Sequence, residues 1–243
     1  MSPHGTPDWG LVGPKSIVYG LDDMGELAVR LGSSHLWDRR GDVLYATDFR
    51  DGMGMFYAWG IGLGWAVNLV TSHSRQGAYS VNLKAGSNLE AIAAITLRLP
   101  FQEQSSVGLE CSFSIDALTS SILDQHHWYD GSRHCNAFIR YDHVGKQLLY
   151  LDNAGAEIVL ANNIDLRESI YPEHTMKLVV NMIERTYVRF MLDDLTYNMK
   201  GTGIWSEASI VRPYWLFAIT HYAVPGNNPD CYVDNVIVTQ NEP

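Results

Sequence analysis

Residues 107–115 read VGLECSFSI, and apolar and polar side chains alternate through the whole stretch. Successive side chains of an extended strand point to opposite faces, so a period of two indicates a strand with one buried face. The apolar face would carry Val107, Leu109, Cys111, Phe113 and Ile115, and the polar face Gly108, Glu110, Ser112 and Ser114. This stretch therefore predicts a half-buried strand, with Glu110 turned toward solvent.

The same alternation recurs along the chain. The sets that would share a face are Tyr79, Val81 and Leu83; Ala93, Ile95, Leu97 and Leu99; Val188, Phe190 and Leu192; and Trp215, Phe217 and Ile219. Clusters of Gly, Asn, Asp and Pro separate these runs at intervals of roughly 8 to 15 residues, which is typical of an antiparallel sandwich or barrel. Residues 22–32 and 115–127 are predicted as short helices, but they form no βαβ rhythm, which argues against a parallel sheet.

Composition limits the classes of partner. The chain has 243 residues, of which 46% are hydrophobic, so it can bury one large core as a single domain. Its net charge of -10 repels phosphate groups, so we expect binding neither to nucleic acid nor to a membrane. The first residues lack a basic segment followed by an apolar one, which predicts synthesis in the cytoplasm without a signal peptide.

The three cysteines are Cys111, Cys135 and Cys231. An odd number at wide spacing excludes a complete disulfide framework. Two states stay open: three reduced thiols, or one bridge and one thiol.

Five segments in order resemble a known architecture. They are VLYATDFRDGMGMFYAWG (43–60), GAYSVNLKAG (77–86), AFIRYDHVGKQLLYLDNAG (137–155), MKLVVNMIERTYVRFMLDD (176–194) and CYVDNVIVT (231–239). The order is similar to that of jelly-roll sandwiches of the concanavalin A-like lectin and carbohydrate-binding-module type. The resemblance implies an all-β, antiparallel jelly-roll β-sandwich over 43–243, with one or two short helices and an N-terminal arm over 1–42. Lectins, glycosidases, adhesion modules and virion proteins all use this architecture, so it implies a fold and not a ligand.

The resemblance also implies a metal site. Sandwich modules of the carbohydrate-binding type often hold a structural calcium where the first and last strands meet. By similarity, Asp48 and Asp234 would bind it, with Asp51 as a third carboxylate, because calcium prefers oxygen ligands. The alternative is that these side chains serve turns and strand edges, as we expect for Asp142 and Asp152.

The sequence carries no recognisable catalytic pair. Glucanases of this architecture place two carboxylates close together on one strand, whereas Glu110 and Asp116 would lie about 20 Å apart on an extended strand. A retaining glycosidase needs a separation of about 5 Å. We therefore expect no enzymatic activity, and a glycoside hydrolase or lyase ranks third among the functions considered.

Residues 123–135, LDQHHWYDGSRHC, are rich in donors and aromatic rings. Asp124, His126, His127, Asp130 and His134 supply oxygen and nitrogen atoms, but their spacing matches no regular zinc pattern. Trp128 and Tyr129 either bind a sugar or a protein, or plug the end of the sandwich. Phe56, Tyr57, Trp59 and Trp65 raise the same choice, and we select Trp59 and Trp65 as binding candidates.

Residues 1–42 are rich in Pro and Gly and lack strand alternation. Trp37 stands close to Arg39 and Arg40, a composition enriched at protein interfaces. The arm is therefore predicted to bind copies of this chain or other assembly proteins. The leading functional prediction is a non-catalytic structural protein of a large assembly, such as a phage-like virion component, and the alternative is a carbohydrate-binding module.

Overall fold

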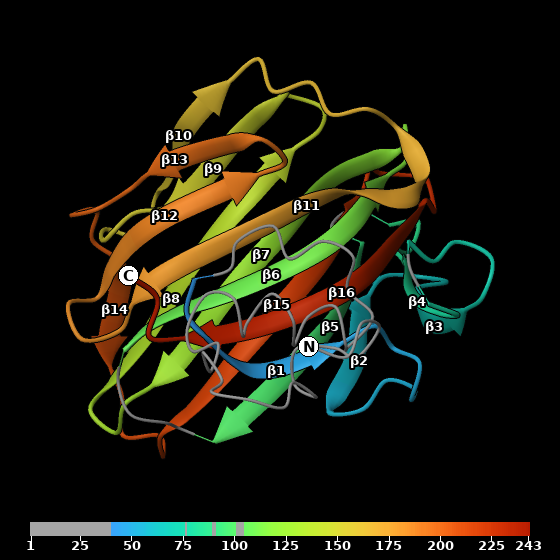
Figure 1. The fold of residues 1–243 in the computed structure, drawn as a ribbon. Helices are drawn as coiled ribbons and strands as arrows, with labels where there is room; N and C mark the ends of the chain where they lie inside the picture. The colour runs from blue at the N-terminus through green and yellow to red at the C-terminus, as the bar shows by residue number, and fades with distance from the viewer. Residues whose placement is uncertain (1–39, 76, 89–90, 101–104) are drawn as a thin grey trace, which may run out of the picture.

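The computed structural model describes residues 40–75, 77–88, 91–100 and 105–243. Two antiparallel sheets face each other and enclose the core between them (Figure 1). These residues contain strands and turns but no helix, so the all-β antiparallel prediction is confirmed and the helix at 115–127 is wrong. Residues 119–129 instead form a strand that pairs on both sides, which shows tertiary pairing overriding local helical preference. The other predicted helix, 22–32, lies outside the described residues.

Within the part of the chain that the structure describes, sheet A contains eight strands and pairs the first strand with the last. Its order is β13 (Leu195–Asn198), β12 (Thr186–Leu192), β11 (Ser169–Asn181), β6 (Ser106–Ile115), β16 (Asp230–Gln240), β4 (Ser80–Lys84) and β3 (Ala66–Val70), and β1 (Asp42–Thr47) also pairs with β16. The pairing of β1 with β16 brings segments far apart in sequence side by side (Figure 1).

Among the described residues, sheet B also contains eight strands. Its order is β10 (Glu157–Asn162), β9 (Gln147–Leu151), β8 (Arg133–Asp142), β7 (Thr119–Tyr129), β15 (Tyr214–Ala223), β5 (Ile92–Pro100) and β2 (Phe56–Ile61), and β14 (Trp205–Ala208) also pairs with β8. Successive strands such as β4 and β5, or β6 and β7, belong to opposite sheets, as expected for a jelly-roll connection.

The apolar faces predicted for β4, β5, β6 and β15 are buried in the core, except that Tyr79, just before β4, is only partly buried against it. The prediction for β12 is wrong at Val188, because the β11–β12 register shifts between Val179 and Val180. As a result β12 buries Tyr187, Phe190 and Leu192, and Val188 stays partly exposed. A bulge of this kind breaks the period of two, so alternation alone does not reveal it.

Glu110 does not face solvent as predicted. It is only 2% exposed, and its carboxylate lies 3.8 Å from the Lys177 ammonium on the neighbouring β11. Strand β6 sits in the middle of sheet A, where both of its faces are covered.

One side chain from sheet A completes the pairing in sheet B. Strand β8 pairs with β9 over 139–142 and with β14 over 133–136, so its partner changes in between. The Tyr187 hydroxyl accepts a hydrogen bond from the Phe138 amide (3.1 Å) and donates one to the Leu151 carbonyl (2.9 Å). It therefore satisfies backbone groups that the ladder leaves open at the point where β14 joins.

All three cysteines are buried, free thiols, so the two cysteine states left open resolve to three unbridged thiols. Burial raises the pKa of Cys135 to about 11 and that of Cys231 to about 12.

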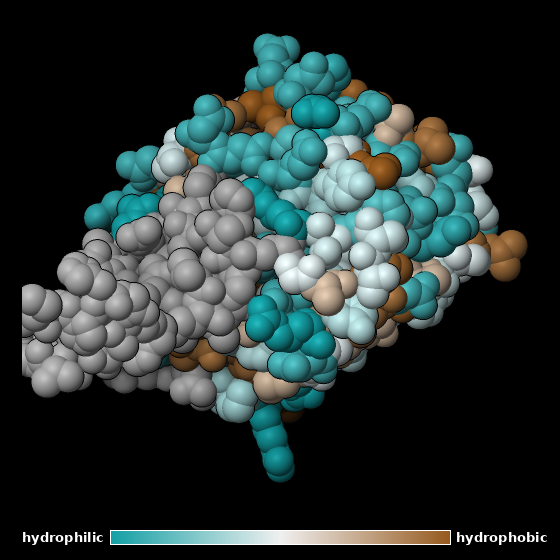
Figure 2. All heavy atoms as spheres, turned by 45° about the vertical axis from the view of Figure 1, so that its right-hand side comes forward, coloured by the Kyte–Doolittle hydropathy of each residue, from teal (hydrophilic) through white to brown (hydrophobic). Residues whose placement is uncertain are grey.

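Surface polarity is mixed on the side of the molecule seen in Figure 2. There, apolar surface forms separate spots among hydrophilic regions. The described part of the chain contains no helix with the length and hydropathy of a membrane span.

Candidate functional site

The outward side of sheet B carries a regular array of aromatic and polar side chains, which we call the B face. Strand alternation puts Trp215 and Phe217 in the core and their neighbours on this side. Cross-strand pairing arranges the B face in rows: Tyr214, Tyr129, His134 and Glu207; then Arg98, Leu216, His127, Asn136 and Trp205; then Tyr57, Thr96, Ala218 and Gln125. Five adjacent strands and β14 therefore build one continuous surface.

Stacked rings order one row of the B face. The Tyr129 ring lies 4.4 Å from the His134 ring at an interplanar angle of 5°, and 4.8 Å from the Tyr214 ring. The Arg98 guanidinium lies 4.0 Å from the centre of the Tyr214 ring, a cation–π contact. Contacts among its own members and with Arg98 of the next row thus hold this row in place.

A hollow of about 360 Å³ opens on the B face. Its lining residues are Tyr57, Trp59, Thr96, Gln125, His127, Leu216 and Ala218. The Trp59 indole is oriented by donating from Nε1 to Thr96 Oγ1 at 2.8 Å, and the Gln125 amide donates to Asn136 Oδ1 at 3.0 Å. Tyr57 stands 47% exposed beside them. The hollow thus combines aromatic surface with amide, hydroxyl and imidazole groups.

Three titratable side chains of the B face are linked. His127 Nδ1 lies 3.1 Å from His134 Nε2, and His134 Nδ1 lies 3.2 Å from Glu207 Oε1. Burial, with His134 as a second cause, lowers the pKa of His127 to about 4. His127 is therefore neutral near physiological pH.

The structure separates the aromatic candidates. Trp59 and Tyr129 lie on the B face, whereas Trp128 is 1% exposed and packs in the core, so it is not accessible for the predicted binding. It points inward because strand alternation puts neighbours Trp128 and Tyr129 on opposite sides of β7. Trp65 packs against Gly60, where an added Cβ would come within 2.5 Å of its ring, and it remains 38% exposed.

The arm candidates are only partly described. Trp37 and Arg39 lie outside the described residues. The Arg40 guanidinium lies 3.8 Å from Met191 Sδ on β12 of the same chain. The boundary between an arm over 1–42 and the sandwich stays a prediction, with β1 beginning at Asp42.

The donors of residues 123–135 do not converge. Asp124 and His126 face the core, while His127 and His134 lie on the B face, because neighbours on a strand point apart. Asp130 closes a turn by accepting from Ser132 and Arg133, and it pairs with Arg185. Within the described parts of the chain, no three His, Cys, Asp or Glu side chains gather in a way that would hold a metal.

The predicted calcium ligands meet other groups. Asp48 directly follows β1, and Asp234 lies within β16, two residues before Val236, the partner of Thr47 at the end of β1. Both carboxylates already have partners within the chain: Asp48 forms an ion pair with Arg50 at 2.5 Å, and Asp234 accepts from the backbone amides of Arg75 and Asn235. Asp51 is exposed. Calcium binding stays a prediction. The contacts of Asp48 and Asp234 are also those expected for carboxylates that stabilise turns and strand edges, the alternative role.

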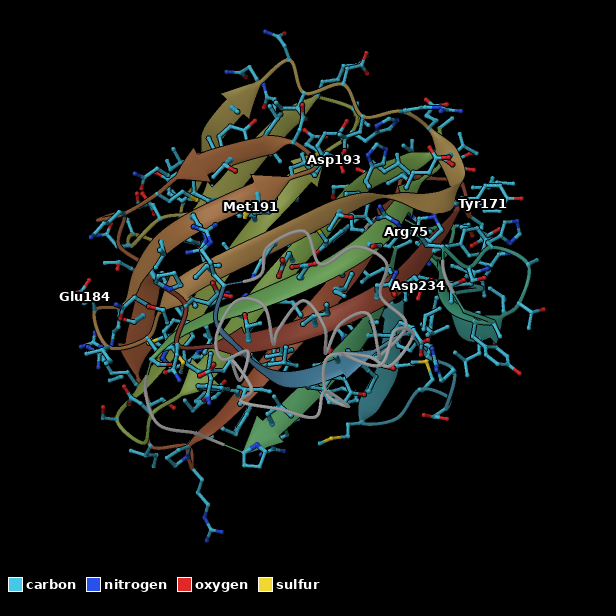
Figure 3. The ribbon with its side chains drawn as sticks, viewed as in Figure 1. Arg75, Tyr171, Glu184, Met191, Asp193 and Asp234 are labelled. Atoms are coloured by element: carbon cyan, nitrogen blue, oxygen red, sulfur yellow. The ribbon has the colours of Figure 1, made fainter. Side chains whose placement is uncertain are left out.

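A second polar cluster lies at one end of sheet A. Figure 3 shows Arg75, Asp193 and Asp234 around this end of the sheet. The Arg75 guanidinium donates to Ser112 Oγ (2.9 Å) and Thr175 Oγ1 (2.6 Å). His174 Nδ1 lies 2.6 Å from Asp193 Oδ2. Burial lowers the pKa of His174, but interactions with its neighbours, the hydrogen bond with Asp193 first among them, together outweigh this effect, so the pKa is raised overall. The cluster is thus engaged in bonds among its own members.

Five residues of the B face are not predicted as site residues from the sequence. Arg98, Gln125, Trp205, Glu207 and Tyr214 were not selected. Alternation gave a usable signal for three of them, since Arg98, Gln125 and Tyr214 occupy the polar phase of strands whose other phase is apolar. Strand β14 is too short for such a signal, so Trp205 and Glu207 join the site only through pairing with β8.

Comparison with known proteins identifies the architecture. No family model and no curated protein sequence matches the chain. The structure is similar to a protein of unknown function with a galectin-like fold from Bacillus subtilis, with a TM-score of 0.53 at 10% identity over 83% of this chain and 97% of the other.

More distant matches include the Emp46p carbohydrate recognition domain in its potassium-bound form, with a TM-score of 0.49 at 11% identity over 83% of this chain and 95% of that one. A glycoside hydrolase family 16 endo-glucanase from Bacteroides ovatus follows, with a TM-score of 0.44 at 11% identity over 81% of this chain and 100% of that one. Similarity at these levels carries no functional inference. The chain thus has the galectin-like, concanavalin A-like sandwich fold that its sequence resembles.

Proposed function

We propose that this protein binds carbohydrate through the B face and does not cleave it. A sugar ring presents an apolar face of C–H groups and an edge of hydroxyls, so it needs an aromatic surface next to polar groups. The observation that carries the proposal is the hollow in which Tyr57 and Trp59 stand beside Gln125 and His127. Aromatic rings with a few placed polar groups are the usual composition of a small-molecule site.

The acidic residues of sheet B support binding without hydrolysis. Within its described strands, Asp124 faces the core and the Asp142 carboxylate accepts from turn amides. Glu207 faces His134 on β8, whereas Glu157 pairs with Arg140, which lies six positions further along β8 than His134. Six residues of strand span about 20 Å, well beyond the 5 to 9.5 Å that paired glycosidase carboxylates need.

Affinity electrophoresis tests the proposal. The protein would be run in native gels containing β-glucan, xylan, galactomannan or alginate, and applied to an oligosaccharide array. We expect retardation by at least one neutral polysaccharide, and its loss in Tyr57→Ala. The matched control is Tyr171→Ala, because Tyr171 on β11 is 48% exposed, nearly the same as Tyr57, and belongs to the other sheet.

Two outcomes contradict the proposal. One is free migration in every gel together with an empty array. The other is equal retardation of wild type and Tyr57→Ala, which would place binding elsewhere. Release of reducing sugar from any of these polysaccharides would contradict only the non-catalytic part.

The assembly function remains a separate prediction. It was motivated by residues 1–42, most of which lie outside the described structure. Light scattering of the full chain, compared with a chain that begins at Gly41, measures whether the arm mediates self-association.

A further inference from the structure

A line of three side chains crosses strands β14, β8 and β7 on the B face. Glu207 Oε1 lies 3.2 Å from His134 Nδ1, and His134 Nε2 lies 3.1 Å from His127 Nδ1. Both separations are within hydrogen-bond range for a nitrogen donor. The line starts at an exposed carboxylate and ends at a ring that lines the hollow.

The protons along this line follow from its first member. An ionised carboxylate only accepts hydrogen bonds, so the proton between Glu207 and His134 is on His134 Nδ1. A neutral imidazole has one N–H, which leaves His134 Nε2 as an acceptor. His127 Nδ1 must then donate to it, and His127 Nε2 carries a lone pair.

No other described group competes for this lone pair. The titratable and charged residues around His127 are His134 on β8, Glu207 on β14, Arg98 on β5, Tyr129 on β7, Tyr214 on β15 and Tyr57 on β2. Arg98 is engaged with the Tyr214 ring, and Tyr129 is stacked on His134. Leu216, the cross-strand neighbour of His127 on β15, is apolar.

We infer that Glu207 acts through His134 as a positioning residue that fixes His127 Nε2 as a hydrogen-bond acceptor in the hollow. This inference rests on the proposed carbohydrate binding and names the ligand class that the hollow takes. An acceptor at this position selects an uncharged sugar that donates a hydroxyl there. It disfavours a sugar acid, whose carboxylate would bring a second acceptor and a negative charge near Glu207.

Acidification reverses the polarity of the site. If His127 takes up a second proton, both of its nitrogens become donors. The acceptor is then lost, so binding of a neutral sugar weakens as the pH falls.

Nitrogen NMR of the free protein tests the proton arrangement without any ligand. Protein labelled with ¹⁵N-histidine reports which ring nitrogen carries hydrogen, and His127→Gln and His134→Gln assign the signals. At neutral pH we expect both rings protonated on Nδ1. Glu207→Ala should convert them to a mixture of tautomers, whereas Glu157→Ala, which removes a carboxylate at the other end of the B face, should leave them unchanged.

The wild-type spectrum alone is decisive, because protonation of either ring on Nε2 overturns the inference. So does a Glu207→Ala spectrum identical to that of wild type. Methyl glucoside, methyl galactoside and methyl mannoside are then added as neutral probes, with glucuronate as the acidic one. A shift of the His127 Nε2 signal by a neutral glycoside and not by glucuronate supports the ligand class, and the reverse contradicts it.

Loss of the positioning residue should lower the affinity for a responding glycoside roughly tenfold, the size expected for one hydrogen bond. The two proposals fail separately. Expected tautomers with no response to any glycoside or polysaccharide would overturn carbohydrate binding and the ligand selection, while the proton arrangement stands. Retardation in polysaccharide gels with His127 protonated on Nε2 would overturn the arrangement, while binding stands.

Discussion

Replacing Tyr187 with Phe removes a single oxygen atom from the junction between the two sheets. The hydroxyl accepts from the Phe138 amide and donates to the Leu151 carbonyl, at the point where β8 leaves β9 and joins β14. Tyr187 is fully buried, so water does not replace the lost partner. Both backbone groups then remain unsatisfied in the folded state.

The expected cost follows from these two groups. A buried polar group without a partner costs ~1–3 kcal/mol, so Tyr187→Phe should lower the free energy of unfolding by about 3 kcal/mol. For a domain of this size, that loss corresponds to a fall in Tm of about 6–12 °C. The substitution keeps the ring and its packing, so cavity formation does not contribute.

Thermal and chemical denaturation measure the loss, and Tyr150→Phe is the matched control. The Tyr150 ring lies 5.6 Å from the Tyr187 ring in an edge-to-face contact, but its hydroxyl forms no hydrogen bond with any described residue. Hydrogen exchange should show faster exchange of the Phe138 amide in Tyr187→Phe only. Equal stability of the two variants, or an unchanged Phe138 amide, would refute the hydroxyl's role in completing the sheet.

Other outcomes follow from the same structure. Asp124→Asn should stabilise the protein near pH 8 and have little effect near pH 4. Burial raises the pKa of Asp124, so the folded state keeps a proton that the unfolded chain releases. In pH-dependent denaturation, the gain in the free energy of unfolding should grow by up to about 1.4 kcal/mol per pH unit above an unfolded pKa of about 3.9. Burial lowers the pKa of His126 in the folded state to about 3, so the wild type should lose stability as the pH falls from the ordinary histidine pKa toward that value. His126→Gln should abolish this loss. Calcium added to chelator-treated protein should raise Tm if Asp48 and Asp234 bind it, and an unchanged Tm would end that prediction. Polysaccharide retardation should weaken as the pH falls to about 4, the value to which burial lowers the pKa of His127.

The sequence predicted the sandwich because its core strands alternate cleanly. Strands β5, β6 and β15 follow a sequence period of two over most of their length, and their apolar phase lies in the core, although β6 buries its polar phase as well. Prediction from the sequence failed where the local pattern and the tertiary pairing disagree. Residues 115–127 have helical composition, but β8 and β15 pair with this segment on both sides. The bulge opposite Val179 and Val180 likewise depends on a partner strand that alternation does not describe.

The site was less predictable because it is assembled across strands. Trp59 and Tyr129 were selected for their aromatic rings, yet the same criterion selected Trp128, which strand phase puts in the core. Residues 123–135 are rich in metal-binding side chain types but have no regular zinc spacing, and alternation sends His126 inward and His127 outward. Glu207 comes from a four-residue strand far along the chain, and only the register with His134 brings it to the B face.

The two sheets differ in how their outer sides use charge, and this difference favours sheet B as the binding surface. On sheet A, Lys177 is fully buried and lies 2.8 Å from Glu242, which also pairs with Arg189. Breaking a buried pair of this kind costs ~3–5 kcal/mol, so these groups are committed to the fold. On sheet B the Gln125–Asn136 pair is neutral, the ion pair of Arg140 with Glu157 is partly exposed, and aromatic rings stay exposed beside them. A ligand can therefore exchange contacts with the B face without uncovering a buried charge, whereas binding on the outer side of sheet A would have to displace ion pairs that hold its strands together.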